Sequence, residues 1–274
     1  MRPTGARSSG RRRTAFHAAW PGVAGGRGWC AGPRQAGRSS WRRSSVRFRR
    51  QPTDRRAVSP NPRAACYGLG QRNGRTLLKV GIVSDLHCNI QGLDLALAAM
   101  GSVDELLCLG DSIFEYQFSN AVVARLRERG AHVIQGNHEE VFLSDAGARA
   151  RERPGIDPEL LGFLAAQPHR KYLELGRKRL LLIHSTPWEP RGDYVHPHSP
   201  KLDRFAEADA DIVLYGHTHC QVVRRIGGVL VINPGSAGDA RDSRNDRQLS
   251  CAVLDTDTEE VSVIDYSDPR FAAR

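Results

Sequence analysis

Five polar clusters, each directly following a hydrophobic run, constrain this 274-residue chain more than any other feature. The clusters are Asp85-Leu86-His87, Gly110-Asp111, Gly136-Asn137-His138-Glu139, His184 and Gly216-His217-Thr218-His219. The runs before them are short and rich in Val, Ile and Leu, a pattern typical of buried β-strands. Any fold for this sequence must therefore place polar side chains at the ends of several strands.

The spacing of the hydrophobic runs predicts an α/β protein. Strands are expected at residues 77–84, 105–109, 131–134, 179–183 and 211–215. Helices are expected at residues 91–100, 120–129 and 201–208, and in parts of 149–172. Four later runs, which we expect to form successive antiparallel strands around a Gly227-Gly228 turn, are residues 221–226, 229–232, 251–255 and 260–264. Strands that alternate with helices indicate a parallel or mixed sheet.

The five clusters are expected to converge, because ligands of open α/β sheets bind beyond the carboxyl ends of the strands. Each residue taken alone has a structural interpretation. Asp85 or Asp111 could cap a helix, Asn137 could lie in a turn, and His184 could be a buried histidine with a hydrogen-bond partner. Five independent caps and turns would have no reason to combine Asp, Asn and His in this way. The whole pattern therefore predicts a metal site.

The residue types indicate which metals would bind. Carboxylate and amide oxygens mixed with imidazole nitrogens suit Mn, Fe, Zn or Ni rather than Ca. A metal pair roughly 3.5–4 Å apart can generate a hydroxide nucleophile and clamp both oxygens of an in-line displacement at phosphorus. We expect two divalent transition metal ions, with Mn as the preferred metal, and hydrolysis of a P–O bond by metal-bound hydroxide.

The order D-x-H, G-D, G-N-H-E, single His and G-H-x-H resembles the signature of the calcineurin-like metallophosphoesterases. Within that superfamily, His184-Ser185-Thr186-Pro187 and Asn233-Pro234-Gly235-Ser236 are similar to segments of the small YfcE-type bacterial and archaeal phosphodiesterases. The resemblance implies a four-layer αββα sandwich of two mixed β-sheets flanked by helices. It also implies a phosphoric ester hydrolase, and a phosphodiesterase in particular.

The resemblance also implies a role for each polar residue. One metal would be held by Asp85, His87 and His219, the other by Asn137, His184 and His217, with Asp111 as the bridge. His138 would be the catalytic residue that protonates the leaving alkoxide or steadies the phosphoryl oxygens. Asn89 would contact a phosphate oxygen.

Several positions depart from the family pattern. Cys88 stands where relatives usually have Gly, and Cys220 follows the last ligand. We interpret both as small packing residues, with an oxidation-sensitive or softer metal site as the alternative. Phe114 occupies the position of the metal-binding Tyr of purple acid phosphatases, and the Asp-Arg-Gly motif of protein phosphatases is missing. His196 and His198 are expected at the surface, and Trp188 either shapes the substrate mouth or packs.

The charged residues are distributed unevenly along the chain. Residues 1–75 hold 18 arginines and one acid, a net charge of +17, whereas the rest holds 22 of the 40 basic and 29 of the 30 acidic residues, a net charge of −7. We therefore expect residues 1–76 to be a basic leader without a packed core, residues 77–266 to be the metallophosphoesterase domain, and residues 267–274 to be a short tail. The leader could be an over-extended start, which we favour, an organellar transit peptide, or a nucleic-acid-binding tail.

Cysteine spacing and hydropathy set the remaining expectations. The six cysteines show no C-x-x-C pairing, and no run approaches the roughly 20 apolar residues of a membrane span. We expect a cytoplasmic protein, or an organellar one if the leader is a transit peptide, with a small phosphoester or nucleotide as its partner and homo-oligomers left open. The alternatives are an idle metal-binding scaffold of the same fold and a nuclease that binds nucleic acid through the leader.

Overall fold

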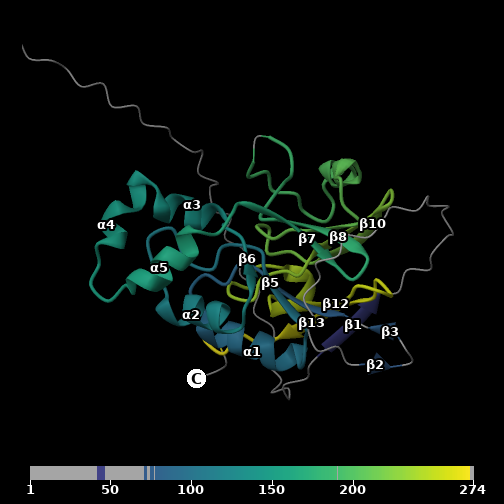
Figure 1. Ribbon diagram of the computed structural model, residues 1–274, viewed down its shortest axis with the longest axis horizontal. Helices are drawn as coiled ribbons and strands as arrows, with labels where there is room; N and C mark the ends of the chain where they lie inside the picture. Colours follow the sequence, from purple (N-terminus) through teal and green to yellow (C-terminus); the bar gives the residue numbers. More distant parts are fainter. Residues whose placement is uncertain (1–41, 47–70, 73–74, 77, 190, 272–274) are drawn as a thin grey trace, which may run out of the picture. The chain divides into compact units, whose positions relative to one another are not determined.

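Two β-sheets form the framework of the protein. The computed structural model describes residues 42–46, 71–72, 75–76, 78–189 and 191–271. The six-stranded sheet has the order β1-β13-β12-β4-β5-β6, and the five-stranded sheet has the order β10-β11-β9-β8-β7 (Figure 1). The strands of the first sheet are β1 (Arg42–Val46), β4 (Lys79–Val83), β5 (Glu105–Cys108), β6 (His132–Val133), β12 (Leu249–Asp255) and β13 (Val261–Tyr266). Those of the second are β7 (Arg170–Leu175), β8 (Lys178–Ile183), β9 (Ile212–Leu214), β10 (Val222–Ile226) and β11 (Val229–Asn233).

Three parallel strands lie side by side in each sheet. They are β4, β5 and β6 in the first sheet and β8, β9 and β11 in the second, and the other pairings are antiparallel. Both sheets are therefore mixed, as the sequence predicted. Each of the five polar clusters follows one of these parallel strands, so the topology brings all of them to strand ends of the same kind.

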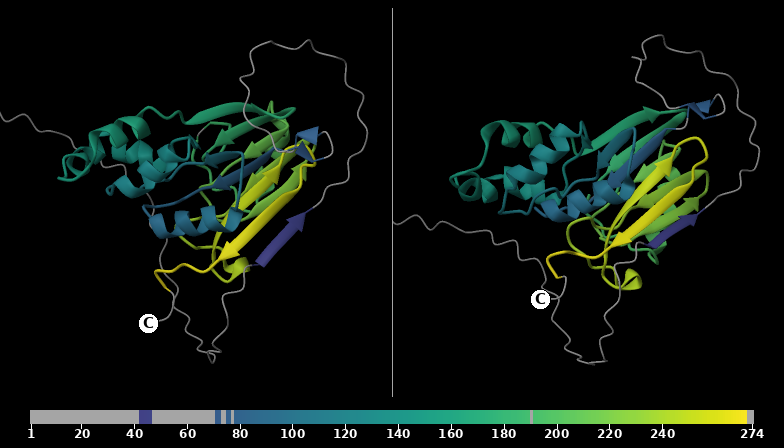
Figure 2. Two further views of the ribbon diagram at one scale, coloured as in Figure 1. Left: turned by 60° about the horizontal axis from the view of Figure 1, so that its bottom comes forward. Right: turned by 90° about the horizontal axis from the view of Figure 1, so that it is seen from below.

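The chain is arranged in four layers. Val80, Ile82, Leu180, Leu182 and other aliphatic side chains of both sheets form one buried cluster, so the two sheets pack face to face. The other face of the six-stranded sheet is covered by helices (Figure 2). The helices are α1 (Ile90–Met100), α2 (Asn120–Glu128), α3 (Asn137–Leu143), α4 (Ala148–Arg151) and α5 (Pro158–Ala165). Among the described residues, no helix is both long and apolar enough to cross a membrane.

Short polar side chains fix where the helices begin. The Asn89 Oδ1 atom accepts from the backbone N–H of Gly92 at the start of α1, at 2.9 Å. Ser119 caps α2 in the same way, and Asp157 caps α5 ahead of a proline in its first turn. These caps satisfy N–H groups that the first helical turn cannot pair internally. The loops between strand and helix thereby acquire defined end points.

The outer layer on the five-stranded sheet contains the helix expected at residues 201–208, in 3₁₀ form. It is formed by the 3₁₀-helix η2 (Pro200–Glu207) and the loop that precedes it, which bury Leu202, Phe205 and Val195 against the sheet. The helical pattern of residues 201–208 was sufficient to predict a helix but could not distinguish its hydrogen-bonding type. Two further single-turn 3₁₀ segments are η1 (Asp145–Gly147) and η3 (Ser243–Asn245).

One strand prediction was wrong. The four later strands do not form one antiparallel series, because β10–β11 belongs to the five-stranded sheet and β12–β13 to the six-stranded sheet, and β11 is parallel to β9. Residues 234–248 cross from one sheet to the other. Residues 149–172, expected to be helical in parts, contain α5 and most of α4, and β7 begins at the end of this stretch. Hydrophobic alternation indicates a strand but does not show which sheet the strand joins.

Three short strands lie within residues 1–76, where the sequence predicted no packed structure. β1 pairs antiparallel with β13 at the edge of the six-stranded sheet, and β2 (Gln71–Arg72) pairs with β3 (Arg75–Thr76) (Figure 2). The remaining residues of the expected leader lie outside the described residues. The leader and domain boundaries therefore stay a prediction there.

An ion cluster joins the two sheets at the strand ends away from the polar clusters. Glu259, in the turn between β12 and β13, binds both Lys178 at the start of β8 and Arg225 on β10. The Glu259 side chain is only 7% exposed, compared with 16% for Lys178 and 29% for Arg225. Removing one partner of a buried ion pair leaves the others desolvated and uncompensated.

We predict that Glu259→Gln lowers the free energy of unfolding by roughly 2–3 kcal/mol, less than the ~3–5 kcal/mol of a fully buried pair because Arg225 is partly exposed. Urea denaturation measures the change, with Glu174→Gln on the exposed side of β7 as the matched control. A loss no larger than that of the control would show that the cluster does not hold the sheets together.

Candidate metal centre

The predicted ligands lie on loops with an uncommon backbone conformation. Of the nine non-glycine residues with positive φ among those described, five are predicted metal ligands: Asp85 (54°), His87 (45°), Asp111 (51°), His217 (66°) and His219 (55°). This left-handed conformation is costly for residues with a Cβ atom, and such strain concentrates at functional sites. Backbone hydrogen bonds between the loops hold it in place, including those from Asp85 N to Gly110 O and from His87 N to Asp111 O.

Two glycines allow the loops to approach each other. A Cβ atom on Gly216 would lie 1.9 Å from the Ser84 Oγ atom and 2.7 Å from Asp85 Oδ2. A Cβ atom on Gly136 would lie 2.3 Å from Asp111 Oδ1. The glycines of the G-H-x-H and G-N-H-E motifs are therefore required because a side chain there would displace a carboxylate of the site.

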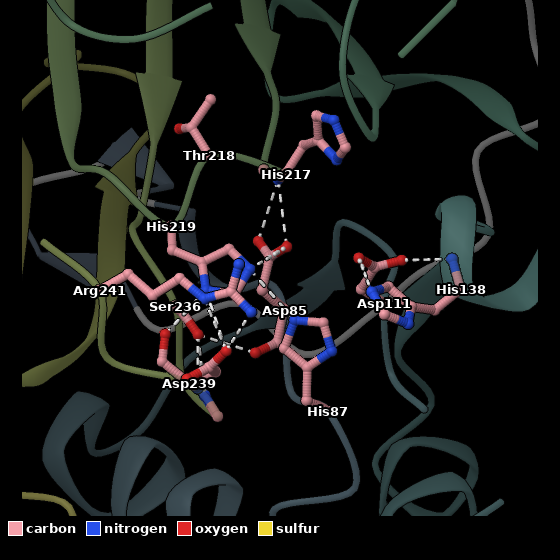
Figure 3. Close-up of polar contacts among 12 residues, drawn as sticks. Asp85, His87, Asp111, His138, His217, Thr218, His219, Ser236, Asp239 and Arg241 are labelled. Carbon is pink, nitrogen blue, oxygen red and sulfur yellow. Dashed lines mark hydrogen bonds and ion pairs between the residues drawn. The ribbon is translucent and has the colours of Figure 1, made fainter. Parts of the chain in front are cut away.

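One ligand group combines residues of both sheets. Asp85 and His87 follow β4, and His219 follows β9 (Figure 3). The Nε2 atoms of His87 and His219 are 3.1 Å apart, and His219 Nε2 lies 3.3 Å from Asp85 Oδ1. The backbone N–H of His217 also donates to the Asp85 carboxylate, at 3.1 Å. Three donor atoms thus converge within the 4.8 Å span of a candidate metal site.

A second group lies beside the first and also spans the sheets. His184 Nε2 is 3.2 Å from Asp111 Oδ2, 3.0 Å from Asn137 Oδ1 and 3.2 Å from His217 Nδ1. Asp111 additionally forms a group with His87 and His138. Its carboxylate is therefore the one that lies within reach of ligands from both groups. The structure brings together all seven residues that the sequence singled out as ligands.

Backbone carbonyls orient the imidazole rings. The Nδ1 atom of His184 faces Leu109 O at 2.7 Å, and the Nδ1 atom of His219 faces Asp239 O at 2.7 Å. The Nε2 atom of His217 faces Gly192 O at 3.2 Å. In a neutral ring, an N–H that donates to a carbonyl leaves the other nitrogen free for a metal, which is the arrangement that metal-binding histidines adopt. Burial opposes protonation of His184 and His219, but Asp111 raises the pKa of His184 to about 10 and Asp85 raises that of His219, so a bound cation would replace a proton at these two rings.

Burial and neighbouring charge shift the pKa values of the site. Burial lowers the pKa of His87 to about 4, and burial together with His184 lowers that of His217 to about 4. Both rings are therefore neutral at pH 7, which is the form that binds a cation. For Asp85, burial opposes ionisation, but His219, His184 and His87 lower its pKa below the ordinary value. This carboxylate is an ionised oxygen donor.

The donor set fits a bound cation. The Nε2 atoms of His87 and His219 face each other at 3.1 Å, where one of them must carry a proton to form a hydrogen bond, whereas a cation between them would accept the lone pairs of both. Within the described part of the chain, the buried His87 Nδ1 and Ser84 Oγ also have no hydrogen-bond partner. Oxygen and imidazole donors in this combination suit divalent transition metals.

Glu139 supports the loop of Asp111, a role that the sequence analysis did not assign. Its Oε1 atom accepts from the N–H groups of Ser112 and Ile113, and its Oε2 atom accepts from those of Asp111 and Gly136, at 2.7–3.2 Å. Burial and the Asp111 charge raise the pKa of Glu139 to about 7, while the backbone donors favour its ionised form. The Glu in the G-N-H-E motif was the available sequence signal.

Asn233 and Ser236 support the loops of Asp85 and His217. The Asn233 side chain donates to Gly216 O at 2.8 Å, and the Ser236 hydroxyl donates to Asp85 O at 2.8 Å. The sequence analysis used this N-P-G-S segment only as a family resemblance. Its position at the end of β11, the third parallel strand of the second sheet, explains why it reaches the site.

His138 lies beside the two ligand groups, at a longer distance from Asp111 than the predicted ligands are from one another. Its Nε2 atom is 3.7 Å from Asp111 Oδ2, and its Nδ1 atom is 2.5 Å from the Glu115 carboxylate and 3.0 Å from the Glu115 backbone N. The carboxylate contact requires a proton on Nδ1, whereas the backbone contact requires none. We favour the carboxylate contact because it is shorter and charge-assisted. Glu115 was not singled out from the sequence.

Asn89 is occupied by structural hydrogen bonds. Its side chain accepts from Gly92 N and donates to Gly238 O at 3.1 Å, and only 3% of the residue is exposed. The phosphate contact expected from the family resemblance stays a prediction.

Other residues singled out from the sequence have defined surroundings. Cys88 has a φ of 62°, where the glycine of its relatives would be unstrained. Its thiol donates to Gln117 O at 3.2 Å, and burial raises its pKa to about 11, which keeps it protonated. Trp188 packs against Phe205, and His196 and His198 are exposed, as expected.

Fold and site together define a class: a layered α/β protein with a candidate metal centre at the carboxyl ends of its parallel strands. The family model for the calcineurin-like phosphoesterase superfamily domain matches residues 78–259. The chain therefore belongs to this family, as the order of its motifs predicted.

Comparison with known proteins identifies similar sequences and folds. Phosphodiesterase YfcE of Escherichia coli strain K12 is 26% identical over 205 residues, which cover 72% of this chain and 97% of YfcE. A metallophosphoesterase from Sphaerobacter thermophilus has a TM-score of 0.57 at 23% identity, over 72% of this chain and 90% of that chain. The hypothetical protein PH1004 from Pyrococcus horikoshii OT3 has a TM-score of 0.58 at 17% identity, over 71% and 90% of the two chains. The two structures support the fold.

We predict that Glu139→Gln weakens metal binding by about 10- to 100-fold, because an amide would turn one N–H donor group toward backbone N–H groups and release the Asp111 loop. The measurement is metal affinity by competition with a chromogenic chelator. The neighbouring Glu140→Gln, whose side chain is 42% exposed, is the control and should bind metal as the unmodified chain does. Equal affinities for the two variants would exclude this role for Glu139.

Proposed function

We propose that this protein is a phosphodiesterase that works with two divalent transition metal ions, with Mn as the expected metal. The observation that carries the proposal is the position of Asp111, whose carboxylate is shared between the group containing His87 and the group containing His184 and His217. One metal would be held by Asp85, His87 and His219, and the other by Asn137, His184 and His217. Asp111 would bridge them.

The metal pair, when bound, would supply an activated water and neutralise charge on the phosphoester. The protein residues would do the rest. The Asp85 and Asp111 carboxylates, 0% and 2% exposed, hold negative charge in a buried region and so favour cations there. The Leu109, Gly192 and Asp239 carbonyls hold the ligand rings in fixed orientations. Preformed geometry reduces the reorganisation needed on substrate binding.

His138 would act as the general acid in this proposal. Glu115 faces its Nδ1 atom, so a protonated His138 can donate from Nε2 toward the side of Asp111. A proton delivered there would neutralise the alkoxide that leaves phosphorus. The substrate class we expect is a small phosphodiester, and similarity to a protein named phosphodiesterase supports this choice over a monoester.

The decisive measurement is hydrolysis of bis-p-nitrophenyl phosphate and p-nitrophenyl phosphate by the full chain, with Mn²⁺ and with a chelator. We expect Mn²⁺-dependent cleavage that favours the diester and is lost with the chelator. Preference for the monoester would overturn the phosphodiesterase assignment. No cleavage of either ester by a protein carrying two metal ions would favour the idle scaffold instead.

We predict that His138→Asn lowers kcat by about 10²- to 10⁴-fold, because the amide cannot transfer the proton, while the content of bound metal is unchanged. Metal content by inductively coupled plasma spectrometry accompanies the kinetics. His169→Asn is the matched control, since His169 pairs with Glu140 and its side chain is 45% exposed. If the His138 variant loses its metal together with its activity, His138 acts as a ligand rather than as an acid.

A further inference from the structure

Tyr194 is an exposed aromatic residue in direct contact with the candidate metal centre. Its ring stacks on His217, with centroids 3.9 Å apart and planes inclined by 28°. Tyr194 is nevertheless 58% exposed, the most exposed tyrosine among the described residues. The ring is therefore held against a predicted ligand, and the His196 ring lies nearly parallel to it with the centroids 6.2 Å apart, yet more than half of Tyr194 stays exposed.

The backbone on both sides of Tyr194 is anchored. Gly192 donates its N–H to Ser185 Oγ at 2.8 Å, and its carbonyl faces His217 Nε2. Asp193 accepts from Lys201 Nζ at 2.8 Å and from Trp188 Nε1 at 3.3 Å. These contacts hold the chain up to the residue before Tyr194.

The residue after Tyr194 is held as firmly. Val195 is fully buried beneath η2, and its carbonyl accepts from the Tyr215 hydroxyl at 2.9 Å. The loop is therefore anchored at Gly192, Asp193 and Val195, on both sides of one exposed ring. The fold presents Tyr194 at a fixed place beside the metal ligands, although exposing an aromatic ring forgoes the free energy gained by burying it.

We infer that Tyr194 is a stacking platform for a planar aromatic group attached to the phosphoester, such as a nucleobase or an aryl ester. This inference rests on the proposed function, because it assigns a substrate class to the same site. An aromatic side chain can stack on any planar aromatic group, whichever base or substituent it is. We therefore expect Tyr194 to favour substrates with an aromatic ring without distinguishing one base from another. A rigid loop adds affinity because little conformational freedom is lost on binding.

The test compares three phosphate compounds on the Mn²⁺-loaded full chain by isothermal titration calorimetry: AMP, phenyl phosphate and ribose 5-phosphate. AMP and ribose 5-phosphate share the sugar phosphate and differ in the base, so the ratio of their affinities reports the contribution of stacking. We expect AMP to bind at least tenfold more tightly. Tyr194→Leu should lower this ratio at least about fivefold, towards equal binding of the two compounds, and Tyr194→Phe should preserve it.

The phenyl phosphate measurement distinguishes the two sources of the aromatic group. A Tyr194→Leu effect on AMP that exceeds the effect on phenyl phosphate assigns the platform to nucleosides, and the reverse assigns it to small aryl esters. Tyr172→Leu is the matched control, since Tyr172 on β7 is 43% exposed and covered by Arg179.

An unchanged ratio in Tyr194→Leu would overturn the inference. So would an equal loss for all three compounds, because Tyr194 would then only hold His217 in place. Binding is read independently of turnover, so the two proposals can fail separately. A chain that binds AMP through Tyr194 but cleaves neither p-nitrophenyl ester would overturn the proposed reaction and support the platform.

Discussion

The close contact of Gly216 with Ser84 and Asp85 is the constraint on which the rest of the site depends. It joins the end of β9 in one sheet to the end of β4 in the other, and a single added methyl group would collide with a carboxylate there. The His217 N–H then reaches Asp85, and the His184 carbonyl receives the Gly216 N–H. Both ligand groups contain residues of the two sheets, so neither group can form until the sheets meet.

Holding these loops in a strained conformation requires compensating interactions nearby. Left-handed residues at the site are offset by backbone hydrogen bonds between loops and by buried side chains that each serve several N–H or C=O groups, notably Glu139 and Asn233. Such fully bonded polar groups are stabilising, whereas the same groups left unpaired would be costly. The loop around Tyr194 is built in the same way, because hydrogen bonds at Gly192 and Val195 anchor the backbone on both sides of an exposed side chain.

The order of motifs was sufficient to predict the family, the two mixed sheets and the set of residues that converge at the strand ends. Asp85, Asp111, Asn137, His184 and His217 each follow a hydrophobic run that proved to be a parallel strand. The local sequence pattern did not predict which strands pair with each other. β11 and β12 look alike as sequences, yet they join different sheets, and β7 alternates too weakly between exposed and partly buried residues to be recognised. Pairing depends on contacts remote in sequence, which a local pattern does not contain.

The sequence by itself determined which chemical groups are available, because strand periodicity and the polar residues that interrupt it are local properties. Only the tertiary structure decided which atoms face one another. It set which ring nitrogen of His184, His217 and His219 faces the site, through the backbone carbonyls of Leu109, Gly192 and Asp239. A backbone carbonyl is present in every residue, so no sequence pattern marks these three. It also paired Glu115 with His138 and placed Tyr194 on His217, residues that are 23 positions apart in each case. The physical reason is that orientation and stacking arise from the packing of two sheets and their loops, and packing is a property of the folded chain as a whole.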